Sequence, residues 1–268
     1  MRLLVFNLAI AWACAMHARA DTLYGDNFTH PGTAATIYQI DTNTGLTTPV
    51  VTVSNATQGE DADITFLNDV LYVTNNSVGG TSYFGTIDLN TGVFTAIAPD
   101  NGGWQGLAAN PAAGILYAVD DSQTGDPLLS VTPSGTITAI GDTNIDVGDL
   151  AFNSNDGILY ALDTNGNLYT IDTTTGAATN QGATGTGGAD TALGYDNLNN
   201  VLYVDSASCK GLCSVNTSTG ATTFIGGDGT RFEGLADLTV PEPGGAALSG
   251  LGLAALVFAR LPRYGAKA

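Results

Sequence analysis

The amino-acid sequence predicts an all-β fold, a five-bladed β-propeller built of four-stranded blades. Three observations lead to this prediction: a repeat of about 43 residues, a common strand and turn pattern within each copy, and a missing first strand in the first copy that reappears after the last. The composition agrees, because only 12% of the 268 residues are charged and 35 are glycine. Such a composition is typical of short strands joined by tight turns.

The first strand of each copy defines the repeat. The phrase GLAANPAAGILYAVD at Gly106 recurs as DLAFNSNDGILYALD at Asp149. The aliphatic anchors of this strand are spaced by 43, 43, 43 and 42 residues, at Ile64, Leu107, Leu150, Leu193 and Leu235. Four short strands per interval of this length match a propeller blade. A β-sandwich, the main alternative, does not repeat internally at this interval.

The later strands follow the same order in every copy. A second strand carries Leu-Tyr, at Leu23-Tyr24, Leu71-Tyr72, Leu116-Tyr117, Leu159-Tyr160 and Leu202-Tyr203. A third strand ends just before a turn that contains Gly45, Gly92, Gly135, Gly176 or Gly220. Glycine supplies the positive φ that such turns need. A fourth, Thr-rich strand follows, as at 177–181.

The ends of the repeat predict how the ring closes. The first copy begins at Asp21 directly with its Leu-Tyr strand, and the surplus first strand is FEGLADL, Phe232–Leu238. We expect this segment to become the innermost strand of the blade that begins at Leu23, which makes 21–239 one propeller. LYVTNN at Leu71 resembles the signature of YVTN-type propeller repeats, and the Leu-Tyr rhythm is broadly similar to NHL-like propellers. The resemblance implies the architecture and no activity.

Residues 1–20 predict a secretory signal peptide. Arg2 supplies the positive start, residues 3–16 are mostly apolar, and Ala18-Arg19-Ala20 forms a small-residue cleavage site. We therefore expect export by the Sec machinery with cleavage before Asp21.

Residues 240–268 predict a membrane-anchored tail. Val240-Pro241-Glu242-Pro243 precedes sixteen uncharged residues, 244–259, which predict a transmembrane helix. A basic stop follows, at Arg260, Arg263 and Lys267. Pro-Glu-Pro, a Gly/Leu/Ala-rich span and arginine resemble the PEP-CTERM sorting signal, although a denser arginine cluster is usual. The resemblance implies processing by an exosortase, a transient stay in the inner membrane of a Gram-negative bacterium, and delivery to the cell surface or an exopolysaccharide-rich matrix.

The distribution of charge restricts the partners. Between Asp21 and Val240 only Lys210 and Arg231 are basic, whereas 24 of the 25 acidic residues of the chain lie there. A body this acidic repels phosphate backbones, so nucleic acid is not expected as a partner. Cys209 and Cys213 are the two cysteines that follow the leader. Their spacing in an exported chain favours a disulfide.

Acidic residues just before the first strands are the candidate ligands for a cation. They are Asp61, Asp63, Asp146, Asp149, Asp190 and Glu233. If they gather at one mouth of the channel, their oxygens could hold Ca²⁺. The alternative is that they are ordinary strand-start residues that face water.

Three functions remain open. The first is a non-enzymatic binding or scaffold module at the surface, with a polysaccharide as ligand. The second is a Ca²⁺-dependent hydrolase or lyase that uses carboxylates at the channel mouth. The third is a docking or sensor domain for another secreted protein. His30 is the only histidine after the leader, so a Ser or Cys nucleophile lacks an evident base.

Overall fold

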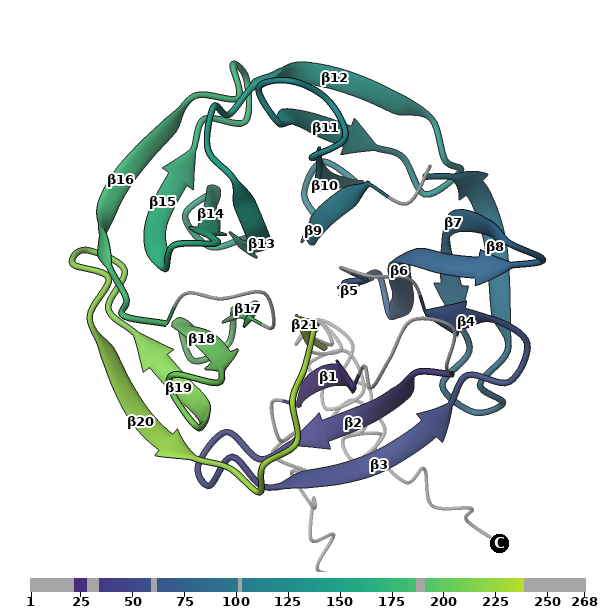
Figure 1. The fold of residues 1–268 in the computed structure, drawn as a ribbon, viewed down its shortest axis with the longest axis horizontal. Helices are drawn as coiled ribbons and strands as arrows, with labels where there is room; N and C mark the ends of the chain where they lie inside the picture. Colours follow the sequence, from purple (N-terminus) through teal and green to yellow (C-terminus); the bar gives the residue numbers. More distant parts are fainter. Residues whose placement is uncertain (1–21, 28–33, 59–61, 101–102, 187–190, 239–268) are drawn as a thin grey trace, which may run out of the picture.

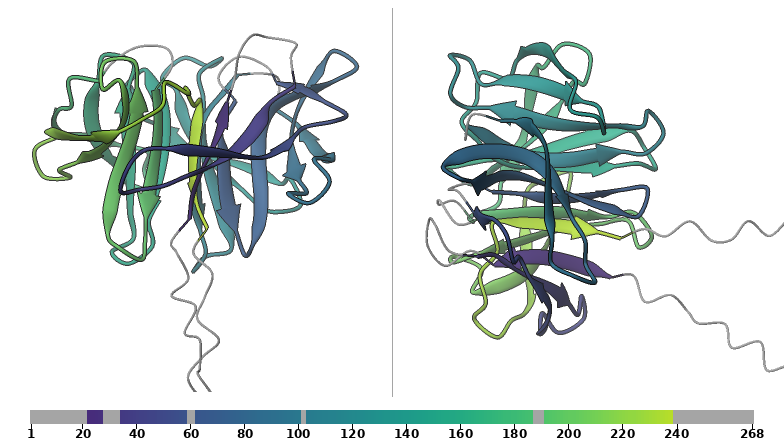
Figure 2. Two further views of the ribbon diagram at one scale, coloured as in Figure 1. Left: turned by 90° about the horizontal axis from the view of Figure 1, so that it is seen from below. Right: turned by 90° about the vertical axis from the view of Figure 1, so that its right-hand side faces the viewer.

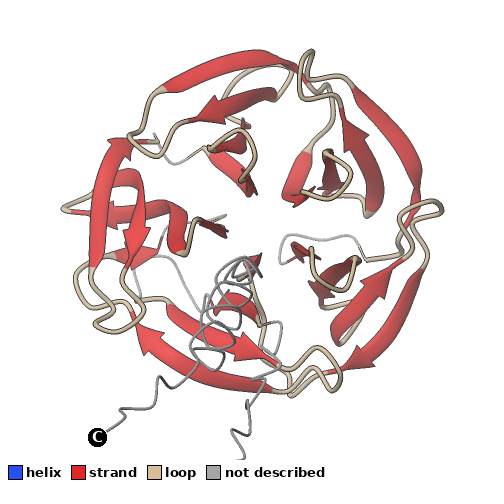
Figure 3. Cartoon of the chain, turned by 180° about the vertical axis from the view of Figure 1, so that it is seen from behind, coloured by secondary structure: helices blue, strands red, loops and turns tan. Residues whose placement is uncertain are grey.

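The fold was analysed in a computed structural model, which describes residues 22–27, 34–58, 62–100, 103–186 and 191–238. Five sheets stand around one axis, as Figure 1 shows, and every regular element of the described residues is a strand (Figure 3). The predicted five-bladed propeller is therefore confirmed. In the described part of the chain, no helix has the length and apolarity needed to cross a bilayer. The transmembrane helix predicted within 240–268 lies outside the described residues.

Each blade has four strands, of which the innermost lies at the axis and the outermost at the rim. Blade 1 contains, from the axis outward, β21 (Gly234–Asp237), β1 (Leu23–Asn27), β2 (Thr36–Ile40) and β3 (Thr47–Thr52). Blade 2 contains β5 (Ile64–Leu67), β6 (Val70–Val78), β7 (Thr81–Ile87) and β8 (Phe94–Pro99). Blade 3 contains β9 (Trp104–Asn110), β10 (Ile115–Asp120), β11 (Pro127–Val131) and β12 (Ile137–Asp142).

Blade 4 contains β13 (Val147–Asn153), β14 (Ile158–Asp163), β15 (Asn167–Ile171) and β16 (Ala178–Ala183). Blade 5 contains β17 (Thr191–Asp196), β18 (Val201–Ser206), β19 (Gly211–Val215) and β20 (Thr222–Gly226). One short strand was not predicted, β4 (Thr57–Gln58), which pairs with the end of β6. It lies where β6 shifts register between Val73 and Asn76 and runs beyond β5.

Blade 1 combines strands from both ends of the described chain. β21 pairs antiparallel with β1, with Leu23 opposite Asp237 and Asp26 opposite Gly234. Phe232, which the prediction placed in this strand, precedes it and packs its ring over Gly25. The closing strand is thus shorter than the predicted Phe232–Leu238, but its partner is the predicted one.

The hydrophobic core is divided among the five interfaces between neighbouring blades. Each interface holds one cluster of buried side chains. The Leu-Tyr pair of the second strand explains this arrangement, because adjacent strand residues point to opposite faces of a sheet. In blade 4, Leu159 packs against blade 3, whereas Tyr160 stacks on Tyr195 of blade 5. A single blade could not bury both of its faces, and the ring covers both.

The outer rim is joined by the glycine turns between third and fourth strands. Gly45 of blade 1 lies against Gly226 of blade 5, and Gly176 of blade 4 lies against Gly141 of blade 3. Gly45 and Gly176 have φ values of 67° and 80°, a region that L side chains rarely adopt. Since a Cβ at either position would collide with the neighbouring backbone, these turns need glycine both for conformation and for space.

The ring has two different faces. We name the face that carries Thr22 and Leu238 the tail face, because the described chain starts and ends on it. There the Leu238 amide donates to the Thr22 carbonyl over 3.2 Å. The opposite, or far, face carries the ends of β10 and β14 at Asp120 and Asp163. Figure 2 shows β1 and β21 side by side, with the start of one and the end of the other on the same side of the ring.

Candidate functional site

Two buried aspartates lie on the channel axis, one residue before the anchors of β5 and β13. Asp63 and Asp149 have exposed fractions of 2% and 0%. Each carboxyl links two neighbouring blades through backbone amides. Asp63 accepts the amide of Ile64 over 2.6 Å and also that of Leu107 in blade 3. Asp149 does the same with Leu150, over 2.5 Å, and with Leu193 in blade 5.

The two carboxyls also contact each other. The charge of Asp149 acts on the Asp63 carboxyl, so the two buried groups interact with each other. Burial, followed by the charge of Asp149, raises the pKa of Asp63 well above its usual value. Burial raises the pKa of Asp149 to about 7, although hydrogen bonds to its oxygens oppose the change. Loss of solvation is the largest cause of both raised pKa values, and a low-dielectric site also penalises two adjacent negative charges.

Small residues occupy the equivalent position in the other three blades, which makes room for the pair. These residues are Gly106, Ala192 and Gly234. A Cβ on Gly234 would collide with Asp63 and would lie 2.7 Å from the Ile64 amide nitrogen. Asp26 of β1 lies beside them, fully buried, and accepts the Gly234 amide over 2.8 Å.

Between this pair and the tail face the channel is nearly filled. A cavity of about 30 Å³ remains, lined by first-strand residues of all five blades, among them Thr65, Leu107, Leu150, Gly194 and Leu235. This volume holds one or two water molecules. Neither Asp63 nor Asp149 lines this cavity, so the pair is separated from it by the strands.

The described members of the predicted cation ring do not gather at one place. Asp63 and Asp149 use their oxygens inside the channel, whereas Asp146 is exposed and accepts the Thr164 hydroxyl over 2.7 Å. Glu233 is partly buried just before β21. Asp61 and Asp190 lie outside the described residues. Across the described ranges no group of three or more His, Cys, Asp or Glu is placed to hold a metal ion.

The described acidic residues lie apart because their side chains point in different directions. A residue one position before a first-strand anchor points to the axis, and a residue four positions before it lies in a loop on the far face. The sequence did contain a signal for the pair: Asp63 and Asp149 alternate with Gly106, Ala192 and Gly234 at one repeat position. That alternation of large and small residues is what a narrow shared axis requires.

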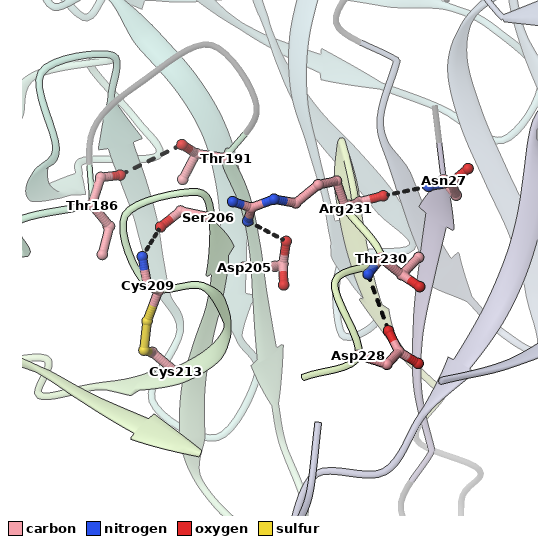
Figure 4. Close-up of polar contacts among 10 residues, drawn as sticks. All are labelled: Asn27, Thr186, Thr191, Asp205, Ser206, Cys209, Cys213, Asp228, Thr230 and Arg231. Atoms are coloured by element: carbon pink, nitrogen blue, oxygen red, sulfur yellow. Dashed lines mark hydrogen bonds and ion pairs between the residues drawn. A yellow bond between two sulfur atoms is a disulfide. The ribbon is translucent and has the colours of Figure 1, made fainter. Parts of the chain in front are cut away.

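A second polar site lies on the far face, where the segment before β21 crosses from blade 5 to blade 1. Figure 4 shows Arg231 between Asp205 and Asn27: its guanidinium is 3.3 Å from the Asp205 carboxylate, and its carbonyl accepts the Asn27 side-chain amide over 2.8 Å. Burial raises the pKa of Asp205 to about 6, and the charge of Arg231 opposes the rise. Arg231 thus joins the two blades that complete the ring.

Cys209 and Cys213 lie beside this site and are joined by a disulfide, with their Cα atoms 6.3 Å apart (Figure 4). The Cys209 amide donates to the Ser206 hydroxyl over 3.0 Å. The bond closes the loop between β18 and β19 on the far face. The predicted cleavage site at Ala18 and Ala20, the motif Val240-Pro241-Glu242-Pro243 and the basic stop at Arg260, Arg263 and Lys267 all lie outside the described residues.

Comparisons with known proteins agree with the fold. No protein-family model matches the chain, and no curated protein matches it. Among solved structures, a chain of a nidogen/laminin complex is similar, with a TM-score of 0.53 and 12% identity over 81% of this chain and 98% of that chain. At this identity the similarity supports the propeller architecture alone.

Two bacterial structures resemble the chain more distantly. TolB from Acinetobacter baumannii has a TM-score of 0.49 and 14% identity, covering 81% of this chain and 54% of that chain. The calcium-binding protein regucalcin from Agrobacterium tumefaciens has a TM-score of 0.45 and 14% identity, covering 68% and 67%. Neither carries an argument about a ligand of this chain.

Proposed function

We propose that this chain is an exported cell-surface or extracellular-matrix protein of a Gram-negative bacterium, and that its propeller is a non-enzymatic binding or scaffold module. In this proposal the leader directs Sec export and the tail, 240–268, is sorted by an exosortase-type enzyme after a transient stay in the inner membrane. The disulfide between Cys209 and Cys213 supports an oxidising compartment, since such bonds are rare in the cytosol.

One observation carries the proposal: the described chain begins and ends on the same face of a closed ring. Leu238 is hydrogen-bonded to Thr22, so a tether that follows Leu238 leaves from the tail face beside the start of the ring. The far face then points away from the anchor. An anchored module that presents one whole face outward suits a binding or scaffold role.

The chemistry of the described residues supports a role without catalysis. Their two cysteines are bonded to each other, so neither is a free thiol nucleophile. The carboxyl pair, Asp63 and Asp149, is buried and does not line the channel cavity of about 30 Å³, which argues against the hydrolase or lyase alternative at that pair. A general acid must reach a substrate within hydrogen-bond distance, and here the surrounding strands prevent it.

The ligand we propose is a bacterial polysaccharide, and retention on immobilised exopolysaccharide tests this. The purified chain should bind extracellular polysaccharide from a Gram-negative matrix and should lose binding after heat denaturation. Binding only to proteins of the extracellular fraction would replace the polysaccharide with a docking partner. Product formation from the polysaccharide would overturn the non-enzymatic role.

The sorting step has its own test, the substitution Glu242→Ala within the Pro-Glu-Pro motif. In cells that contain an exosortase, the variant should stay in the inner-membrane fraction, while the parent chain reaches the surface or the medium. Asp142→Ala, which removes one exposed carboxylate on the ring, is the matched control and should be sorted normally. Equal distribution of parent and Glu242→Ala chains would contradict the sorting proposal.

A further inference from the structure

The Asp63–Asp149 pair links four of the five blades at the axis, and within the described residues neither carboxyl contacts a basic side chain. We propose that the two carboxyls share a proton at neutral pH and act as a proton-dependent latch that holds the inner strands of the ring together. The latch is a property of the fold and goes beyond the proposed binding function.

The burial of the pair favours a retained proton. All four oxygens of the pair accept backbone amides, from Ile64 and Leu107 on one side and from Leu150 and Leu193 on the other. Both carboxyls are nevertheless buried, with exposed fractions of 2% and 0%, and the charge of Asp149 acts on Asp63. Two neighbouring carboxylates that lack both water and a basic partner are costly to keep ionised together, so one of them retains a hydrogen.

The position of the pair explains why its charge matters for the whole ring. Asp63 connects β5 to β9, and Asp149 connects β13 to β17, so the pair acts on the contacts of blades 2, 3, 4 and 5. The closing strand β21 packs against the same point, because Gly234 lies next to Asp63. Repulsion between two carboxylates at this point therefore weakens the contacts between blade 1 and blade 2.

Few other ionisable groups face the pair. Asp26 on β1 adds a third carboxyl, whose charge raises the pKa of Asp149, and Glu233 precedes β21 on the far face. β9 has no ionisable side chain, and those of β17 and β21 are Tyr195, Asp196 and Asp237 at the tail-face ends of their strands.

The second strands next to the pair place few ionisable groups near it. Tyr72 on β6 and Tyr160 on β14 stack on Phe84 and Tyr195, and Asp163 ends β14, where it accepts bonds from the Asn167 backbone and side chain. No basic group of these elements replaces the proton.

The sign of the pH effect follows from the raised pKa values. An aspartate in the unfolded chain has a pKa of about 3.9, whereas Asp149 in the ring has one of about 7 and Asp63 lies well above the usual value. The folded state therefore binds more protons between these limits. Stability from the latch is fully present below about pH 4, falls as pH rises, and is lost once both carboxyls ionise.

The experiment is equilibrium unfolding of the purified chain in urea between about pH 5 and 8, with Asp149→Asn as the test variant. For the parent chain the unfolding constant should rise with pH, by up to about tenfold per pH unit for each proton retained on folding. Asp149→Asn removes one titrating carboxyl and gives Asp63 an amide donor. The number of protons retained on folding should therefore fall by about one, and the unfolding constant should rise less steeply with pH. Asp172→Asn, at an exposed turn, should leave the rise unchanged.

Two results would overturn the latch. Equal pH dependence of the parent chain and Asp149→Asn would show that the pair does not hold a retained proton. A large stabilisation by added Ca²⁺, abolished by chelator and by Asp149→Asn, would show that the pair holds a cation instead. Should the variant fail to fold, infrared spectroscopy of the parent chain decides, because the carbonyl stretch of a protonated carboxylic acid must persist at neutral pH.

Discussion

The inner ring and the outer rim use the same residue, aspartate, in opposite ways. At the axis, burial raises the pKa values of Asp63 and Asp149. At the rim, the turns between third and fourth strands carry Asp88 and Asp172, which are fully exposed. Hydrogen bonds from the residues that follow them lower their pKa values, chiefly from the Asn90 amide for Asp88 and from Thr174 for Asp172.

The difference shows that the surroundings, and not the residue type, set the protonation state. At the rim, water solvates the carboxylate and local amides stabilise its charge. At the axis, the amides are also present, yet removal of water outweighs them. The rim turns are therefore negatively charged hydrogen-bond acceptors, whereas the inner pair retains a proton and depends on it.

The largest expected effect comes from filling the space beside the inner pair with Gly234→Ala. The added Cβ would collide with Asp63 and with the Ile64 amide, so the closing strand must move or the Asp63 bonds must break. We expect a loss of about 3 kcal/mol or more in the free energy of unfolding, or an unfolded chain, measured by urea denaturation. Gly148→Ala is the control: it meets only ordinary contacts at 3.4 Å and should change stability little. Similar losses in both variants would contradict tight packing at the axis.

A smaller effect is expected from Arg231→Ala, at the crossing from blade 5 to blade 1. Without the guanidinium, the Asp205 carboxylate stays buried and loses its ion pair, which costs about 1–3 kcal/mol. The pKa of Asp205, about 6 in the parent chain, should rise further. Because a raised pKa removes stability as pH increases, the loss should be greater at about pH 8 than at about pH 5.

The double variant Arg231→Ala/Asp205→Asn sharpens this test. It removes the carboxylate together with its partner, so its stability relative to Asp205→Asn alone should no longer depend on pH. A pH-dependent loss that persists in the double variant would assign the effect to groups other than Asp205.

The smallest effect is expected at the rim, from Asp172→Ala. The substitution removes an acceptor for the Thr174 and Thr175 amides and should lower the thermal midpoint slightly near neutral pH. A lowered pKa contributes stability above the unfolded value of about 3.9 and loses it as pH falls. The difference from the parent chain should therefore become smaller in acid. Asp172→Asn keeps an acceptor, as Asn216 does for the Ser218 amide in the equivalent turn of blade 5, but it lacks the charge, so at neutral pH its midpoint should lie between those of the parent chain and Asp172→Ala.

Much of the fold could be predicted from the sequence because the same strand and turn pattern occurs in every blade. The spacing of Leu107, Leu150 and Leu193 fixes the blade length, and each Leu-Tyr pair assigns one side chain to each face of its sheet. The surplus strand near Leu235 indicated closure onto β1, which the pairing confirms. The strand β4 was missed, because a two-residue strand follows from a local irregularity of β6 and not from the repeat.

The buried site could be predicted only in part. Asp63 and Asp149 were predicted to lie at the channel. Their closeness to each other depends on the radius of the ring, which cannot be read from a local sequence pattern. The expectation that they join Asp146 in one ring failed, since a shift of three positions moves a side chain from the axis to the far face. Arg231 was noticed only as a rare cation; its partner Asp205 lies 26 residues away on a neighbouring strand.

The origin of blade 1 has a consequence for how the protein is made. The Gly234 amide reaches Asp26 across 208 residues of chain, so the blade that starts first is completed last. During synthesis, blades 2 to 5 can each form from strands that follow one another in the chain. The inner edge of β1 stays unpaired until β21 has been made. Contacts of such long sequence separation slow folding, and an unpaired edge invites association with other chains. The ring can therefore unfold and fold as one cooperative unit only after its last strand, β21, has been synthesised.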